Sequence, residues 1–237
     1  MGDVASGAVG IVVGMAFEAK CLHAALAWHP DLPEPLIHVT GAKRGRAEEG
    51  ARALIAKGAR ALLSFGIAGG LDPALRPGDI VIADDVKFVG KADIETDSGW
   101  RETVLAGAKT FAPSRIAPIL SVDQAVQTVG EKTRLRAETG AAVVDMESYG
   151  VAFEATAANI PVLAVRVVAD TADRALPHLA AGAIRPDGTV RIGPVLRGLM
   201  RNPAAIAGLI GVGRDTGKAQ RVLRRVAFGN LAALLRT

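Results

Sequence analysis

Short apolar runs alternate along the chain with longer segments in which apolar residues recur at helical spacing. A run of four to eight apolar residues is typical of a buried strand, and a spacing of three and four residues is typical of an amphipathic helix. The expected strands are Val9–Val13, Leu36–Val39, Ala61–Phe65, Asp79–Ala83, Ile116–Val122, Ala142–Asp145 and Val162–Val168. The expected helices are Glu18–Trp28, Ala47–Ala59, Glu102–Thr110, Lys132–Thr139 and Glu147–Ala158. This alternation predicts βαβ units and a mostly parallel sheet that is covered on both faces.

The C-terminal segment carries a different pattern, in which an apolar helical stripe is accompanied by arginines. From residue 191 to residue 237 there are nine basic residues and one acid, although the net charge of the whole chain is only +4. We therefore expect a main domain over residues 1–190 and a basic, partly amphipathic helical extension over residues 191–237. This extension either packs on the main domain or lies at an anionic membrane or beside a lipid.

The composition excludes several classes of site. Cys21 is the only cysteine and there are four histidines, so a disulfide framework or a metal centre built from Cys and His is not expected. The longest apolar stretches are far shorter than the ~20 residues of a membrane span, and the N-terminus lacks a basic signal-peptide region. We expect a cytoplasmic protein that uses no metal.

Three acidic residues follow expected strands, at the sheet edge where ligands of parallel α/β folds collect. Glu18 follows the first strand, Glu147 follows a later one, and Asp170 follows the last; Gly66 and Gly69 form a glycine-rich turn at the same edge. Acids without a nearby His or Cys suit proton transfer and hydroxyl binding. The alternatives are that Glu18 is a solvated acid of a first helical turn, that the other two acids cap helices, and that the glycines only form a tight turn.

Three segments, in this order, resemble the signature of the purine and uridine phosphorylase superfamily. They are Ser64–Asp72 with its continuation Leu75–Val81, Val144–Ser148 and Val165–Asp173. The resemblance covers roughly residues 8 to 175 and implies a single-domain, three-layer α/β/α fold with a mixed, largely parallel sheet. Within the superfamily the chain is most similar to hopanoid-associated phosphorylases, in Val13–Lys20 and in the long basic tail after Pro186–Gly188.

The resemblance implies cleavage of the N-glycosidic bond of a purine nucleoside and assigns roles to the acids. Asp170 would donate a proton or hydrogen bond to N7 of the base, Glu147 would bind the ribose hydroxyls, and Met146 would pack under the ribose. Glu18 would activate water, as in the hydrolytic branch of the superfamily. Ala125 stands where adenine-cleaving relatives place an aromatic residue that stacks on the base. The further expected substrate-binding residues are Gly14, Gly66, Ala68, Gly69 and Val126.

The chain departs from the pattern of relatives that use phosphate. Ser64 and Ile67 stand where those relatives usually have an arginine and a hydroxyl residue. Neither side chain can replace the bidentate hydrogen bonds that an arginine donates to phosphate. Lys43 and Arg44, close to Arg46, would substitute for it or would form a solvated turn. Both phosphorolysis, with inorganic phosphate as co-substrate, and hydrolysis are therefore open.

The narrower resemblance implies release of adenine from adenosylhopane by phosphorolysis in hopanoid biosynthesis, without an organic cofactor; a phosphate-independent nucleosidase of the same substrates is the alternative. The expected partners are a small nucleoside, free or lipid-linked, and a second copy of the chain in a homodimer. The tail, with Ile206, Leu209 and Ile210, would then contact the inner face of a membrane. Alternatives are a non-catalytic nucleoside- or lipid-binding descendant of the fold, and nucleic-acid binding by the tail. The latter is disfavoured because Phe228 is the only aromatic residue after Phe153.

Overall fold

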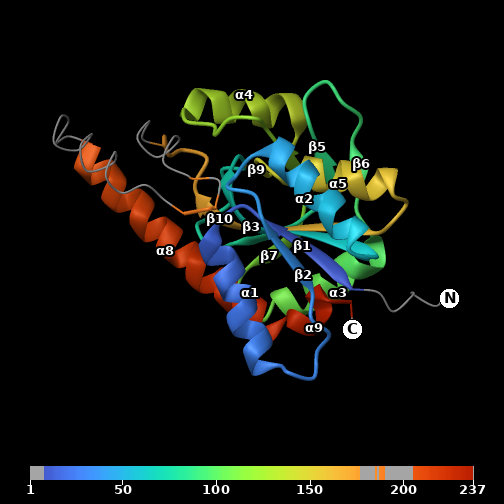
Figure 1. Cartoon of the computed structure of the whole chain (residues 1–237). Coiled ribbons are helices and arrows are strands. Elements are labelled where there is room, and N and C mark those ends of the chain that lie inside the picture. Colours follow the sequence, from blue (N-terminus) through green and yellow to red (C-terminus); the bar gives the residue numbers. More distant parts are fainter. Residues whose placement is uncertain (1–7, 177–184, 186, 190–204, 237) are drawn as a thin grey trace.

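The computed structural model describes residues 8–176, 185, 187–189 and 205–236, which form three layers with a ten-stranded sheet in the middle (Figure 1). The strands are β1 (Val9–Val13), β2 (Leu36–Val39), β3 (Ala61–Gly70), β4 (Ile80–Ile82), β5 (Asp85–Lys87), β6 (Ile94–Glu95), β7 (Ser114–Ile116), β8 (Ile119–Ser121), β9 (Val143–Asp145) and β10 (Val162–Asp170). The helices are α1 (Ala16–Trp28), α2 (Arg44–Ala56), α3 (Ser98–Ala108), α4 (Val129–Thr139), α5 (Ser148–Ala157), α8 (Ala205–Gly229) and α9 (Leu231–Leu234).

The sheet is mixed and largely parallel, as the sequence predicts. Its main path runs β6-β5-β8-β9-β3-β10-β4-β7, with β1 and β2 branching from β3. The pairs β3–β9, β4–β10 and β5–β6 are antiparallel, and the other pairs are parallel.

The long strand β3 creates the opening in which the candidate site forms. One of its edges pairs with β10 along most of its length. The opposite edge pairs first with β1, from Ala61 to Ser64, and then with β9, at Gly69 and Gly70. Between these two pairings, neither β1 nor β9 accepts hydrogen bonds from the backbone N–H groups at this edge of β3. These N–H groups can therefore donate to another acceptor.

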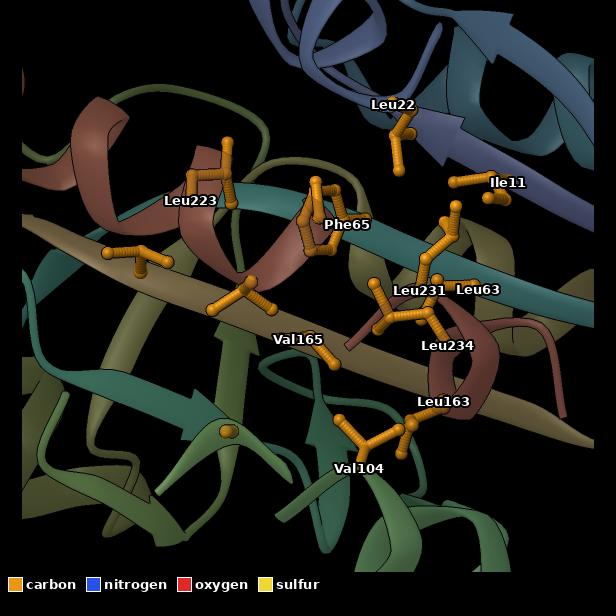
Figure 2. Packing of buried hydrophobic residues seen from close by; sticks show 14 of the residues in the cluster. Ile11, Leu22, Leu63, Phe65, Val104, Leu163, Val165, Leu223, Leu231 and Leu234 are labelled. Carbon is orange, nitrogen blue, oxygen red and sulfur yellow. The ribbon is translucent and has the colours of Figure 1, made fainter. Parts of the chain in front are cut away.

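Two hydrophobic layers hold the helices on the sheet. Helices α1, α3, α8 and α9 share one buried cluster, and α2 and α5 share the cluster on the other face. In Figure 2, Leu223 from α8 and Leu234 from α9 lie on the same side of the sheet as Phe65 and Val165. These side chains have little or no exposure to water, so their burial supplies the main stabilising free energy.

Strand β10 is buried over its whole length and contains an irregularity near its end. Val168 pairs with Ala68, but the next partner, Gly69, pairs with Asp170. The extra residue, Ala169, therefore makes a β-bulge, a feature that often redirects side chains next to active sites.

Three differences from the expected elements have clear physical causes. The expected strand Ile116–Val122 is divided into β7 and β8, because Pro118 has no N–H to continue a ladder. Strand β3 continues through its glycines to Gly70, and the short strands β5 and β6 carry too few apolar residues to be predicted. Helix α8 packs against α1 and β10, whereas residues 191–204 and 237 of the expected extension lie outside the described residues.

Candidate active site

A cavity of about 210 Å³ opens at the carboxyl ends of the central strands. It is lined mainly by apolar side chains and backbone, and five ionisable side chains also reach it. These are Glu18, Lys132, Asp145, Glu147 and Asp170. Such a wall, apolar with a few convergent polar groups, is typical of a small-molecule site.

Glu18 lies in the first turn of α1, which begins directly after β1. Its residue is only 2% exposed, which excludes the solvated-acid alternative. Oε1 accepts a hydrogen bond from the backbone N–H of Ile67 (2.9 Å), and Oε2 accepts one from Met15 (2.8 Å). Glu18 thus occupies the unpaired stretch of β3. Burial, partly offset by Arg166 and these hydrogen bonds, raises the pKa of Glu18 to about 7.

Arg166, in the middle of β10, is the buried cation of the site. Its Nε donates to Oδ2 of Asp145 (2.7 Å), and a terminal nitrogen donates to Oγ of Ser64 (2.7 Å). The same nitrogen lies 3.6 Å from Oε2 of Glu147. One guanidinium therefore faces two carboxylates directly, and it also acts on Glu18 through space. Because one positive charge cannot balance three negative ones, protonation of a carboxyl is favoured.

Glu147 precedes α5 but does not cap it, because its side chain makes no capping hydrogen bond. A Cβ on Gly14 would lie 2.7 Å from Oε1 of Glu147, so the glycine makes room for this carboxyl. Burial first, and then the charge of Asp145, raise the pKa of Glu147. Asp145 itself is held by the hydroxyls of Ser121 and Ser148, which brace the loop that carries Glu147.

Asp170 forms a buried ion pair with Lys132, which comes from α4. Lys132 Nζ donates to Oδ2 of Asp170 and to the carbonyl oxygen of Thr171, the latter at 2.7 Å. The side chains of the pair are 1% and 7% exposed. Burial raises the pKa of Asp170, and the Lys132 ammonium opposes that rise. Asp170 is therefore a partner of a lysine, and not a helix cap.

The structure brings most of the predicted site residues together. Those that line the cavity are Gly14, Glu18, Ala68, Gly69, Val126, Met146, Glu147 and Asp170. Gly66 lies behind Glu18, where a Cβ would be 2.8 Å from the carboxyl carbon of that residue. The glycine is therefore required by the approach of Glu18, and its role is not limited to a tight turn.

The candidate phosphate-binding residues do not line the cavity. Lys43 and Arg44 do not line the cavity, although their neighbour Ala42 does. Arg44 is paired with Asp123 (2.7 Å) and Glu48 (2.7 Å). Two acidic partners already satisfy this guanidinium, which leaves it little capacity for an additional anion.

Sequence reasoning assigned no role to three charged residues of the site, which are Asp145, Arg166 and Lys132. Arg166 stands inside the quoted segment Val165–Asp173, and an arginine in the middle of an apolar strand is itself a sign of a buried partner. Lys132 is one of several charged residues in α4, and no pattern distinguishes it from its neighbours. Only its contacts with Asp170 and Thr171 in the folded chain identify it.

The arrangement suits proton transfer at two places. Glu18 stands over Gly66, and Asp170 stands over Gly69. Gly66 and Gly69 are three residues apart along β3, a distance of about 10 Å.

Within the described residues, no three His, Cys, Asp or Glu side chains are grouped so that they could hold a metal ion. No helix among the residues that the structure describes is both long and apolar enough to cross a bilayer.

The fold and the site define an α/β enzyme with an acid-lined cavity at the carboxyl ends of its strands. The chain matches the sequence model of the phosphorylase superfamily over residues 8–196. It therefore belongs to the phosphorylase superfamily, and it is an enzyme of the nucleoside phosphorylase and nucleosidase class. Comparison with curated protein sequences gave no match.

Solved structures share the fold at low sequence identity. A putative 5′-methylthioadenosine/S-adenosylhomocysteine nucleosidase from Francisella philomiragia has a TM-score of 0.70 and 18% identity, over 97% of this chain and 99% of that one. Helicobacter pylori futalosine hydrolase has a TM-score of 0.62 and 20% identity, over 68% and 87% of the two chains. A variant of the Helicobacter pylori methylthioadenosine nucleosidase, with 5′-methylthioadenosine in its active site, has a TM-score of 0.65 and 18% identity, over 95% and 98%.

Proposed function

We propose that the protein hydrolyses the N-glycosidic bond of a purine nucleoside and releases the base. The observation that carries this proposal is the position of Glu18. Its buried carboxyl lies on the unpaired stretch of β3, in the same cavity as Asp170. A general base with a pKa of about 7 is suited to activate water near neutral pH.

The proposed reaction distributes protons between the two ends of the cavity. As the bond between N9 and C1′ breaks, its electron pair goes to the purine, and Asp170 gives a proton to N7. Water attacks C1′ from the side of Glu18, which takes the proton that the water loses. Glu147 accepts hydrogen bonds from the ribose hydroxyls and stabilises positive charge on the sugar. General acid and general base assistance each contribute roughly 10²–10⁴ in rate.

The contacts of Glu18 also support hydrolysis over phosphorolysis. Its carboxylate already occupies the N–H groups of Met15 and Ile67, which an anion at this place would need. The guanidinium of Arg166 is engaged with Asp145 and Ser64. Phosphate would therefore enter a cavity whose donors are occupied and whose walls carry carboxylates. Phosphorolysis, which the resemblance to hopanoid-associated enzymes implies, is the competing reaction for the experiment below.

The substrate that we propose is an adenine nucleoside, with adenosylhopane as its lipid-linked form. A nucleosidase of the same fold holds 5′-methylthioadenosine in its active site, which supports adenine as the base. Helix α8 supports the lipid: Arg214, Lys218, Arg221 and Arg225 are exposed, and their spacing places them on one helix face. A cationic face suits an anionic membrane surface. The side chains of Ile206, Leu209 and Ile210 lie outside those described.

Three further expectations belong to this proposal. Residues 1–190 form the catalytic domain, and residues 191–237 form an extension that packs on it. The enzyme works as a homodimer. It is cytoplasmic and makes peripheral contact with the inner face of the membrane through the extension.

The test is adenine release from adenosine, and from adenosylhopane in detergent, with and without inorganic phosphate. Hydrolysis predicts equal rates in both conditions and a free sugar that takes up ¹⁸O from labelled water. A sugar 1-phosphate formed only with phosphate would replace this proposal with phosphorolysis. Release from neither nucleoside by the wild-type protein would favour the non-catalytic binding protein.

A further inference from the structure

Lys132 is a buried cation that the reaction proposed above does not use. It belongs to α4, it is completely buried, and it lines the cavity beside Asp170. Its Nζ donates to Oδ2 of Asp170 and to the carbonyl oxygen of Thr171. Oδ1 of Asp170 accepts no hydrogen bond from any described residue. The lysine therefore fixes one carboxyl oxygen and leaves the other unpaired.

Stability alone does not explain this ion pair. Taking a lysine and a carboxylate out of water is costly, and well-packed apolar residues in place of a buried pair often leave stability unchanged or increase it. Around it, α4 packs through an apolar cluster that includes Leu135, Val126 and Val144. An apolar residue at position 132 would extend that cluster. The charge, on the cavity wall, is therefore better explained by the chemistry of Asp170.

We propose that Lys132 is a positioning residue for Asp170: it holds Oδ2 and leaves Oδ1 to face the purine. This inference rests on the proposed function, because it assigns Asp170 the role of the acid. When Asp170 gives a proton to N7, it becomes a carboxylate. The Lys132 ammonium stabilises that carboxylate through a charge-assisted hydrogen bond, and solvent later returns the proton.

The other charges near Asp170 do not replace this effect. Burial raises the pKa of Asp170, and Lys132 is the main group that lowers it. Asp215 from α8 raises it and Arg174, which follows β10, lowers it. These two residues pair with each other at 3.3 Å, so their effects on Asp170 oppose one another. Glu18 and Glu147 line the same cavity. An acid must still hold its proton to donate it, and Lys132 is the main group that limits how far burial raises the pKa of Asp170.

The direct test is the titration of Asp170 by NMR, which requires no activity. Protein labelled with ¹³C at aspartate carboxyls is titrated as wild type, Lys132→Met and Lys132→Gln, and Asp170→Asn assigns the signal. Loss of the ammonium should raise the pKa of Asp170 by about 1–3 pH units. Lys87→Met, which removes a lysine paired with Asp85 and Asp93 elsewhere, is the matched control and should leave the signal unchanged. An unchanged pKa in folded Lys132→Met or Lys132→Gln overturns the proposal.

Kinetics then separate positioning of the acid from general structural support. Adenosine needs an acid at its base, whereas p-nitrophenyl riboside has a leaving group that does not. With Lys132→Met, kcat/KM for adenosine at pH 7 should fall about tenfold or more, and its alkaline limb should move to higher pH. The p-nitrophenyl riboside should be cleaved within about twofold of the wild-type rate, since it bypasses Asp170.

Two outcomes tell the proposals apart. An equal fall on both substrates with an unmoved alkaline limb assigns Lys132 a merely structural role and overturns the inference. A raised pKa of Asp170 in a protein whose wild type cleaves neither substrate supports the action of Lys132 on Asp170 and overturns the proposed function. If circular dichroism shows that Lys132→Met does not fold, both measurements are made on Lys132→Gln.

Discussion

Glu18 takes the space that a side chain on Gly66 would need. A Cβ built on Gly66 would lie 2.8 Å from the carboxyl carbon of Glu18, which is closer than such atoms approach in proteins. The carboxyl in turn occupies the N–H of Ile67, on the stretch of β3 between its pairings with β1 and β9. The glycine and the glutamate therefore form one structural unit, in which the first permits the position of the second.

The first prediction concerns this unit. Gly66→Ala should displace the Glu18 carboxyl and lower kcat/KM by about 10²-fold or more, because misplacement of a catalytic group by 1 Å costs this much. Gly45→Ala is the control, since a Cβ at Gly45, in α2, meets nothing within 4 Å. Both variants should fold, as judged by thermal melting. Full activity in Gly66→Ala would contradict a role for Glu18 at its present position.

The second prediction is the pH dependence that Glu18 produces. Burial raises the pKa of this carboxyl to about 7, and a general base must be ionised to act. Hydrolysis should therefore increase as pH rises through about 7. Glu18→Gln should lose roughly 10²–10⁴ in kcat/KM and lose this acidic limb. Glu49→Gln, at an exposed position of α2, should behave as wild type. An acidic limb that persists in Glu18→Gln would assign it to another group.

The third prediction concerns the stability that Arg166 provides. Arg166→Met leaves the buried carboxyls of Asp145 and Glu147 without their cation, which should cost about 3–5 kcal/mol in the free energy of unfolding at pH 8. Below the raised pKa of Glu147 that carboxyl is neutral, so the cost should be smaller at pH 5. Urea denaturation at both pH values measures it.

A matched control separates this effect from the loss of any ion pair. Arg134→Met breaks an exposed pair with Glu138 in α4, and it should cost less than about 1 kcal/mol at either pH. Equal losses in the two variants would show that the buried cluster around Arg166 has no special electrostatic role.

The fourth prediction tests the cationic face of α8. Replacing Arg214, Lys218, Arg221 and Arg225 together by Gln should weaken binding to anionic phosphatidylglycerol vesicles by about fivefold per residue. Activity on soluble adenosine should be retained. The control carries Gln at four exposed cations elsewhere, and it has the same net charge. These are Lys57, Arg60, Lys91 and Lys109. Equal loss in both variants would mean that net charge, and not this face, attracts the vesicle.

Hydrophobic patterning predicted the layered fold because buried strands and amphipathic helices differ in period. The runs Val9–Val13 and Leu36–Val39 are strands with the expected bounds. Patterning fails for β5 and β6, which have three and two residues; β5 is held by pairing with β8, more than thirty residues further along the chain, and β6 pairs only with β5 among the described strands. It also underestimates β3, because Gly69 and Gly70 favour turns locally but pair with β9 in the folded chain.

Glu18, Glu147 and Asp170 were predictable as site residues, because each follows an expected strand. Their electrostatic partners were not. Arg166 and Lys132 act through contacts between elements far apart in the sequence, and local spacing carries no information about such pairs. The same holds for Gly66, whose partner is a side chain of α1 and not the ligand that the turn itself would suggest.

The bulge in β10 has a consequence for how this site can be lost. Side chains of β10 alternate between the two faces: Val165, Val167 and Ala169 belong to one core cluster, and Asp170, directly after the bulge, lines the cavity. Asp170 therefore reaches the cavity because of the number of residues in the strand as well as their identity. Insertion or deletion of one residue here would turn the Asp170 side chain away from the cavity, although no residue of the site would be replaced. Length variation in β10 is thus a route to inactivity that no substitution scan would reveal.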